Sequence, residues 1–143
     1  MAEECIQEKV AVILGPGVNI KRNPLGGRCF EYWSETRTWP VMRPSALLKA
    51  CSPRAWHVAQ ALRRQQSRSD RLRVDARISP RALREIYFPA FEHIVKKAQP
   101  WTIMCSYNRI NGVHSAQNHW LLTDVLRDEW ASRASSCPTG RRS

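Results

Sequence analysis

Two long stretches of this chain lack acidic side chains, and they divide the sequence into segments of different character. The 143 residues carry 23 Lys and Arg but only 12 Asp and Glu. Residues 36–69 contain seven basic side chains and no acidic one, and residues 131–143 contain three and none. Segments 1–35 and 70–130 are nearly balanced. At 143 residues the chain is long enough for one hydrophobic core. Only the two balanced segments, however, have the composition of an ordinary folded domain.

A net charge of +11 ordinarily indicates a nucleic-acid partner. Here nearly all of it belongs to the two acid-free segments, so we expect no specific nucleic-acid partner. A small basic nucleic-acid-binding protein is nevertheless the main alternative, supported by Arg63-Arg64 and the interspersed tryptophans. It predicts salt-dependent affinity carried by residues 36–69. Five cysteines without regular spacing predict neither a disulfide framework nor a metal site, and we expect no cofactor.

The chain has no apolar run of the roughly 18–20 residues needed to cross a bilayer. Its N-terminus is acidic and lacks the apolar region of a signal peptide. We therefore expect no membrane partner and favour the cytoplasm. The oligomeric state has no sequence signature.

The balanced segments have the pattern of an α/β protein. The apolar run Val10–Leu14 ends at Gly15-Pro16-Gly17, which predicts a buried parallel strand. Further elements are predicted as follows: a helix from Ser79-Pro80 to about Ala98 with a kink or break at Pro89, a strand at 101–106, and an amphipathic helix at 117–129. This order suggests βα units of a parallel sheet or barrel. Segments 36–69 and 131–143 are predicted to be irregular or weakly helical.

Two long motifs carry a family resemblance. Ile13–Glu35 has the sequence ILGPGVNIKRNPLGGRCFEYWSE, which resembles the signature G-P-G-V-N-I-x-R-x-P-x-x-G-R-N-F-E of glycoside hydrolase family three, the β-glucosidase type. The stretch from Asp70 to Trp130, with CSYNRINGVHSAQN at its centre, resembles the same family in the expected order. Together the two matches cover about two-thirds of the chain.

The family motifs expected in the remaining segments emerge in other reading frames. When Ala131–Ser143 is reverse-translated with suitable codons and read with one base added in front, it gives G-F-E-G-L-V-M-S-D-W-A-P-V. Trp56–Arg68, read one base later, gives G-T-S-L-K-H-F-A-A-N-N-Q, and Thr36–Met42 can give D-P-Y-L-A-G-H. The sequence therefore predicts four parts: barrel segments at 1–35 and 70–130, and frameshifted segments at 36–69 and 131–143.

The resemblance implies part of a (β/α)8 TIM-barrel domain from a hydrolase of terminal β-linked glucose or a related sugar. A retaining glycosidase needs two carboxyl groups about 5–5.5 Å apart. The family's nucleophile is the Asp of S-D-W, whose codon would straddle Pro138 and Thr139 in another frame. The acid/base residue typically comes from a later domain. We therefore predict an incomplete barrel with no catalytic residue and no glycosidase activity of its own.

Two positions match sugar-binding residues of the family. Arg28 corresponds to the arginine of G-R-N-F-E, and Tyr107 follows a predicted strand directly, where barrel enzymes place active-site groups. Arg109 and Asn111 share that loop and are candidates for supporting these residues. A non-catalytic sugar-binding remnant is thus a further alternative. Six other carboxylates on or beside the helices are expected to be solvated or salt-bridged: Asp75, Glu85, Glu92, Asp124, Asp128 and Glu129.

Overall fold

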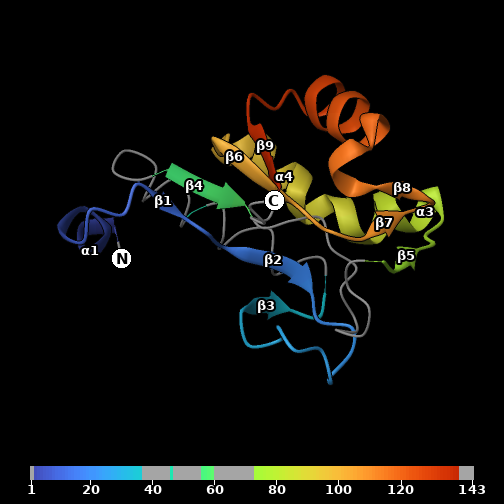
Figure 1. Cartoon of the computed structure of the whole chain (residues 1–143), viewed down its shortest axis with the longest axis horizontal. Helices are drawn as coiled ribbons and strands as arrows, with labels where there is room; N and C mark the ends of the chain where they lie inside the picture. Colours follow the sequence, from blue (N-terminus) through green and yellow to red (C-terminus); the bar gives the residue numbers. More distant parts are fainter. Residues whose placement is uncertain (1, 37–45, 47–55, 60–72, 139–143) are drawn as a thin grey trace.

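A four-stranded parallel sheet forms the centre of the molecule, in the order β1-β4-β6-β9 (Figure 1). The computed structural model describes residues 2–36, 46, 56–59 and 73–138. The sheet consists of β1 (Val12–Ile13), β4 (Trp56–Ala59), β6 (Thr102–Cys105) and β9 (Ser135–Pro138). Each strand in this order pairs in parallel with the next one. This is the arrangement of a (β/α)8 barrel left open, as the sequence predicted.

Two of these strands lie in segments that the sequence predicted to be irregular or weakly helical, and that prediction is wrong for them. β4 falls within 36–69 and pairs with both β1 and β6. β9 falls within 131–143 and pairs with β6 over four residues. Backbone N–H and C=O groups are the same for every residue, so a neighbouring strand can recruit a segment whose side chains show no strand pattern. The other residues of these two segments lie largely outside the described ranges.

β1 is parallel, as predicted, but it is not buried. Val12 is 41% exposed and Ile13 is half-buried. The strand pairs with β4 on one side, and the described residues place no strand on its other side. An apolar, β-branched run is therefore compatible with an edge strand as well as with a central one.

The predicted helix after Ser79 is present, with a change of geometry in its middle. The Ser79 hydroxyl accepts a hydrogen bond from the backbone N–H of Ala82 (3.2 Å), so it caps the helix as predicted. The helix continues through Pro89 instead of breaking. Its parts are α3 (Pro80–Ala82), the π-helical η1 (Leu83–Tyr87) and α4 (Phe88–Ala98). Pro89 has no N–H to donate to the preceding turn of the helix. The wider π-helical turn η1 ends two residues before it.

The second predicted helix begins slightly later than expected. A 3-10 turn, η2 (Ser115–Gln117), leads into the π-helical η3 (Trp120–Glu129). Leu121, Val125 and Leu126 are buried and Leu122 is partly buried, which confirms the predicted amphipathic face. None of the helices in the described ranges has the length and apolar character of a membrane span.

Smaller elements surround the central sheet. The remaining helix and strands are α1 (Ala2–Gln7), β2 (Gly17–Ile20), β3 (Tyr32–Ser34), β5 (Asp75–Ala76), β7 (Arg109–Ile110) and β8 (Val113–His114). β2 and β3 pair in parallel, and β5, β7 and β8 form a third sheet. Figure 1 shows the β2–β3 pair below the central sheet and α1 at its far end.

The core joins β6 to the two helical segments that flank it in sequence. Its buried apolar residues are Val18, Leu83, Phe88, Phe91, Ile94, Val95, Ile103, Ile110, Leu121, Val125, Leu126, Trp130 and Ala134. Phe88 is central, because its ring lies 5.4 Å from that of Trp130 in an edge-to-face arrangement and 6.0 Å from that of Trp120. Arg84 and Glu129 also connect the two helices through two hydrogen bonds of 2.8 and 2.7 Å.

Candidate functional site

Two of the predicted site residues lie in connections that follow strands of the parallel sheet. In parallel strands all carboxyl ends point the same way, and barrel enzymes build their sites from the loops at that end. Arg28 lies in the long connection that follows β1, between β2 and β3. Tyr107 follows β6, two residues after Cys105. Both connections begin at the carboxyl end of a strand of the central sheet.

Arg28 is held within a series of tight turns. The backbone N–H groups of Cys29 and Glu31 donate to the carbonyls of Gly26 (3.1 Å) and Arg28 (3.2 Å). The Arg28 side chain is 22% exposed, and its Nε donates to Glu31 Oε1. Burial alone would lower the pKa of Arg28, but the hydrogen bond to Glu31 and the neighbouring Tyr32 and Glu31 charges outweigh it and raise the pKa. The guanidinium is therefore a fixed, permanently charged donor.

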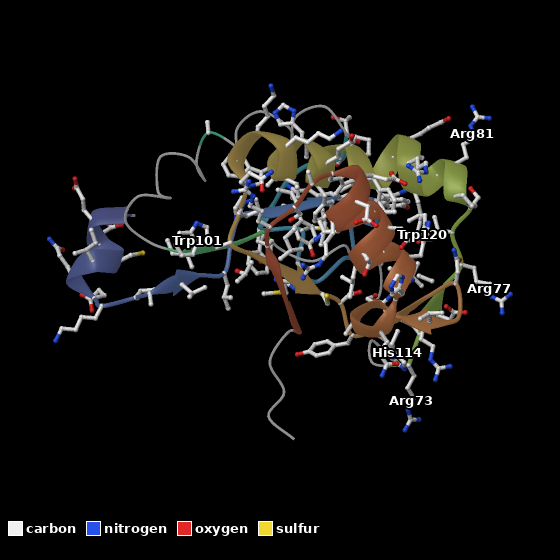
Figure 2. All side chains as sticks on the ribbon, turned by 90° about the horizontal axis from the view of Figure 1, so that it is seen from above. Arg73, Arg77, Arg81, Trp101, His114 and Trp120 are labelled. Atoms are coloured by element: carbon white, nitrogen blue, oxygen red, sulfur yellow. The ribbon has the colours of Figure 1, made fainter. Side chains whose placement is uncertain are left out.

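Tyr107 is connected through its backbone to the hairpin that follows. His114 Nδ1 lies 3.2 Å from the Tyr107 carbonyl oxygen, and Arg109 Nε donates to His114 Nε2 at 3.2 Å. Because Nε2 accepts from Arg109, the ring proton must be on Nδ1, where it donates to Tyr107. Figure 2 shows His114 on this hairpin. Arg109 is thus linked to the Tyr107 backbone through His114.

Asn111 has a structural role that sequence reasoning missed. Asn111 and Gly112 are the two loop residues of the β7–β8 hairpin, and both have positive φ, 52° and 89°. This is the backbone of a type I′ turn, for which Asn-Gly is the strongest short-range sequence signal. The Asn111 amide also accepts from Ile78 N (2.8 Å) and donates to Ile78 O (2.9 Å). Asn111 therefore fastens the hairpin to the start of the helical segment.

Substitutions at Asn111 should separate the contribution of its positive φ from that of its hydrogen bonds to Ile78. We expect Asn111→Ala to lower the free energy of unfolding by about 2 kcal/mol, because it loses two hydrogen bonds and replaces a residue that tolerates positive φ with one that tolerates it less well. Asn111→Gly tolerates the positive φ and should lose about half as much. Urea unfolding followed by circular dichroism measures both, with the exposed Gln117→Ala as control. Equal losses in the Ala and Gly variants would contradict the turn assignment.

A small buried cavity lies beneath the Tyr107 loop, on the helix side of the sheet. Its volume is about 10 Å³, and its lining includes Ser106, Ser115 and apolar residues of β6 and η3. The hydroxyls of Ser106 and Ser115 are 2.7 Å apart, and Ser115 also donates to the Asn108 carbonyl (3.0 Å). Sugar pockets need several hundred Å³. This cavity is therefore part of the packing beneath the loop.

Most of the carboxylates in question lie beside basic side chains, as predicted from sequence. The pairs are Asp75–Arg77 (3.6 Å), Glu85–Arg81 (2.8 Å), Glu92–Lys96 (2.6 Å), Glu129–Arg84 (2.7 Å) and Asp124–His119 (3.3 Å). These pairs lie at the protein surface. Among the described residues, no three His, Cys, Asp or Glu side chains cluster closely enough to hold a metal ion.

The position predicted for the nucleophile lies at the end of β9. Pro138 is the last residue of that strand and is paired with Cys105 of β6. The chain that leaves β9 therefore starts beside the strand that leads into Tyr107. Thr139, the other residue spanned by the predicted Asp codon, lies outside the described residues.

Comparison with solved structures decides the family. A β-glucosidase from Bifidobacterium adolescentis, described as a member of glycoside hydrolase family three, superposes with a TM-score of 0.92 and 65% identity over 96% of this chain. The chain belongs to glycoside hydrolase family three. A glucose complex of a Thermotoga neapolitana β-glucosidase gives a TM-score of 0.92 and 40% identity over 96% of the chain. No family model matches the sequence.

Relatives with curated descriptions agree with this assignment. An exo-α-(1→6)-L-arabinopyranosidase of Bifidobacterium breve is 74% identical over 133 residues, which cover 91% of this chain. A thermostable β-glucosidase B of Acetivibrio thermocellus is 44% identical over the same length. The family-three chain described here spans 17% of the length of each of these relatives, and 21% of the Bifidobacterium adolescentis enzyme.

Proposed function

We propose that this chain supplies one wall of the sugar-binding site of a retaining exo-glycosidase, formed by Arg28 and Tyr107. We also propose that the chain has no hydrolytic activity of its own. The observation that carries the proposal is the high identity to family-three glycosidases, combined with Arg28 and Tyr107 in connections that follow β1 and β6. The bond to Glu31 engages Nε of Arg28, which leaves the Nη hydrogens as donors for sugar hydroxyls. We assign the Tyr107 ring and hydroxyl to the same sugar.

The names of the relatives narrow the sugar to two candidates. The Acetivibrio thermocellus relative is named as a β-glucosidase, and the Bifidobacterium breve relative as an exo-α-(1→6)-L-arabinopyranosidase. We propose that the whole protein removes a terminal pyranose of one of these two kinds. The 74% identity to the arabinopyranosidase favours L-arabinopyranose as the first sugar to test.

Sugar titration tests the binding wall directly. We expect L-arabinose, D-glucose or gluconolactone to bind the purified chain, and Arg28→Ala to weaken binding about tenfold or more, because it removes charged donors to hydroxyls. Isothermal titration calorimetry measures the affinity, and circular dichroism checks the fold. Arg77→Ala is the matched control, since Arg77 is 89% exposed and points into solvent (Figure 2).

Two further variants separate sugar contact from local folding. Glu31→Gln keeps the Arg28 guanidinium but weakens its ion pair, so its sugar affinity should change less than that of Arg28→Ala. Tyr107→Phe keeps the ring and removes only the hydroxyl. If Arg28→Ala and Arg77→Ala bind sugar equally well, or if no sugar binds, Arg28 does not contribute to a sugar-binding site.

We also propose that segments 36–69 and 131–143 are encoded out of frame. In support, 74% identity over 133 positions corresponds to about 98 identical residues, while segments 1–35 and 70–130 contain 96 residues. Two nearly identical segments joined by an unrelated one would give such a total. The S-D-W strand of the restored frame would coincide with β9, and the strand that leads into K-H-F would coincide with β4.

Sequencing of the gene and its transcript tests the frame. We expect single-base changes near codons 36, 50, 56, 69 and 131 to restore one open frame that encodes K-H-F and S-D-W. An accurate read in which no such set of changes joins the two segments would refute the frame assignment. It would leave the family membership intact.

A further inference from the structure

Two consecutive residues, His114 and Ser115, hold the three consecutive residues around Tyr107. The hydroxyls of Ser106 and Ser115 lie 2.7 Å apart. Ser115 also donates to the Asn108 carbonyl, through its backbone N–H (3.3 Å) and its hydroxyl (3.0 Å). The Tyr107 carbonyl oxygen between these contacts lies 3.2 Å from Nδ1 of His114. The end of β8 and the start of η2 therefore contact each residue of the loop in turn.

These contacts differ in burial, which separates their roles. Ser106, Asn108 and Ser115 are buried, whereas Tyr107 and His114 are half-buried. The neighbours of Tyr107 are thus fixed within the packed interior. The Tyr107 carbonyl belongs to the planar peptide group that joins Tyr107 to Asn108, so a hydrogen bond to it restricts ψ of Tyr107. The contact with His114 is therefore the one that acts on Tyr107 itself.

The hairpin register determines which His114 nitrogen carries the proton. Arg109 and His114 are opposite one another in the antiparallel β7–β8 pair, and Arg109 Nε lies 3.2 Å from His114 Nε2. A guanidinium N–H can only donate, so Nε2 accepts and the proton of the neutral ring is on Nδ1. The nitrogen that faces the Tyr107 carbonyl is therefore a donor.

We propose that His114 is the positioning residue of Tyr107: its Nδ1–H holds the Tyr107 carbonyl, and Arg109 keeps that proton on Nδ1. The inference rests on the proposed function, because it concerns the sugar-binding role of Tyr107. His114 does not contact the sugar in this arrangement. It acts by holding the Tyr107 backbone in one conformation before the sugar arrives, which lowers the conformational entropy lost on binding.

The first test reads the proton on His114 directly and needs no sugar. The full chain is labelled with ¹⁵N-histidine, and the ring signals of His114 are identified by their disappearance in His114→Asn. Nuclear magnetic resonance is recorded at about pH 8, where an ordinary imidazole is neutral. We expect couplings that place the proton on Nδ1. A proton on Nε2 would overturn the proposal.

The second test compares three substitutions of His114. The amide nitrogen of Asn is bonded to Cγ, as Nδ1 of His is, so His114→Asn keeps a donor near the Tyr107 carbonyl. In His114→Gln the amide lies one atom farther out, beside Arg109, and His114→Leu has no donor. We expect Leu and Gln to weaken sugar affinity by about three- to tenfold, the effect of one hydrogen bond, and Asn to restore most of it.

Two measurements follow these variants. Calorimetry gives the affinity for L-arabinose, D-glucose and gluconolactone, and the ring signals of Tyr107, identified with Tyr107→Phe, report its conformation without sugar. We expect these signals to move in His114→Leu and to return in His114→Asn. Circular dichroism confirms that each variant is folded. A purely structural role would give no such rescue by Asn over Gln.

His119 provides the matched control, because its side chain is 79% exposed and lies beside Asp124 instead of Tyr107. His119→Leu should leave the Tyr107 signals unchanged and the sugar affinity within about twofold. The proposal is overturned if the Asn and Leu variants of His114 behave alike, or if His119→Leu matches His114→Leu. If the unchanged chain binds no sugar, the proposed function fails, and the His114 proton and the Tyr107 signals still decide whether His114 positions Tyr107.

Discussion

The purified chain should not hydrolyse aryl β-D-glucosides or aryl α-L-arabinopyranosides above the buffer rate. Retaining hydrolysis needs a nucleophilic carboxylate and a second carboxyl group about 5–5.5 Å away. Five of the six carboxylates that we placed on or beside the helices lie in surface pairs with arginine, lysine or histidine side chains. The S-D-W nucleophile is proposed to be encoded out of frame. Removing a nucleophile costs on the order of 10⁶ in rate in a well-studied hydrolase.

Release of p-nitrophenol from the two chromogenic substrates measures this directly, with an intact family-three enzyme as positive control. The same assay on the protein translated from the restored frame is the informative comparison. Turnover by the unchanged chain that Arg28→Ala abolishes would contradict the prediction and would require a carboxylate pair not yet identified. Activity that survives Arg28→Ala would indicate a contaminating glycosidase.

The second large effect concerns the core, at Phe88. Phe88 is 2% exposed and contacts the rings of Trp120 and Trp130, so it joins the two helical segments. We expect Phe88→Ala to lower the free energy of unfolding by about 3–5 kcal/mol, through lost burial and the cavity that remains. A domain of this size has only about 5–15 kcal/mol in total, and an open sheet places this one near the low end. The variant should therefore be largely unfolded at 37 °C.

Near-UV circular dichroism and the urea midpoint follow the loss, because the tryptophans report on the packing around Phe88. Phe30→Ala is a matched control: the same side chain is removed from a position that is 85% exposed. It should change the unfolding free energy by no more than about 0.5 kcal/mol. If both variants unfold at the same urea concentration, Phe88 does not anchor the core.

Local sequence chemistry specified several elements of this fold correctly. Ser79-Pro80 marks the start of a helix because the hydroxyl satisfies a free backbone N–H and the proline needs none. The spacing of Leu121, Val125 and Leu126 identifies the buried face of the second helix. The Asn111-Gly112 pair is also a strong short-range signal for a hairpin, and the loop in which the sequence analysis placed Asn111 contains a type I′ turn.

For the candidate site, the sequence specified which residues to examine but not how they are held. The family motifs point to Arg28 and Tyr107, and both residues lie in connections that follow strands of the parallel sheet. The contact of Glu31 with Arg28 and that of His114 with the Tyr107 carbonyl depend on turn and hairpin geometry. Such contacts have no periodicity, so pattern reading does not reveal them.

The sequence alone determined the family and the two balanced segments that carry its motifs, because those motifs are long and their local signals are short-range. The tertiary structure decided the status of the strands. It placed Val12 and Ile13 at an exposed edge, and it recruited β4 and β9 from stretches whose side chains predicted irregular chain. The physical reason is that strand pairing is made by backbone groups common to all residues, and a partner strand arrives from far along the chain.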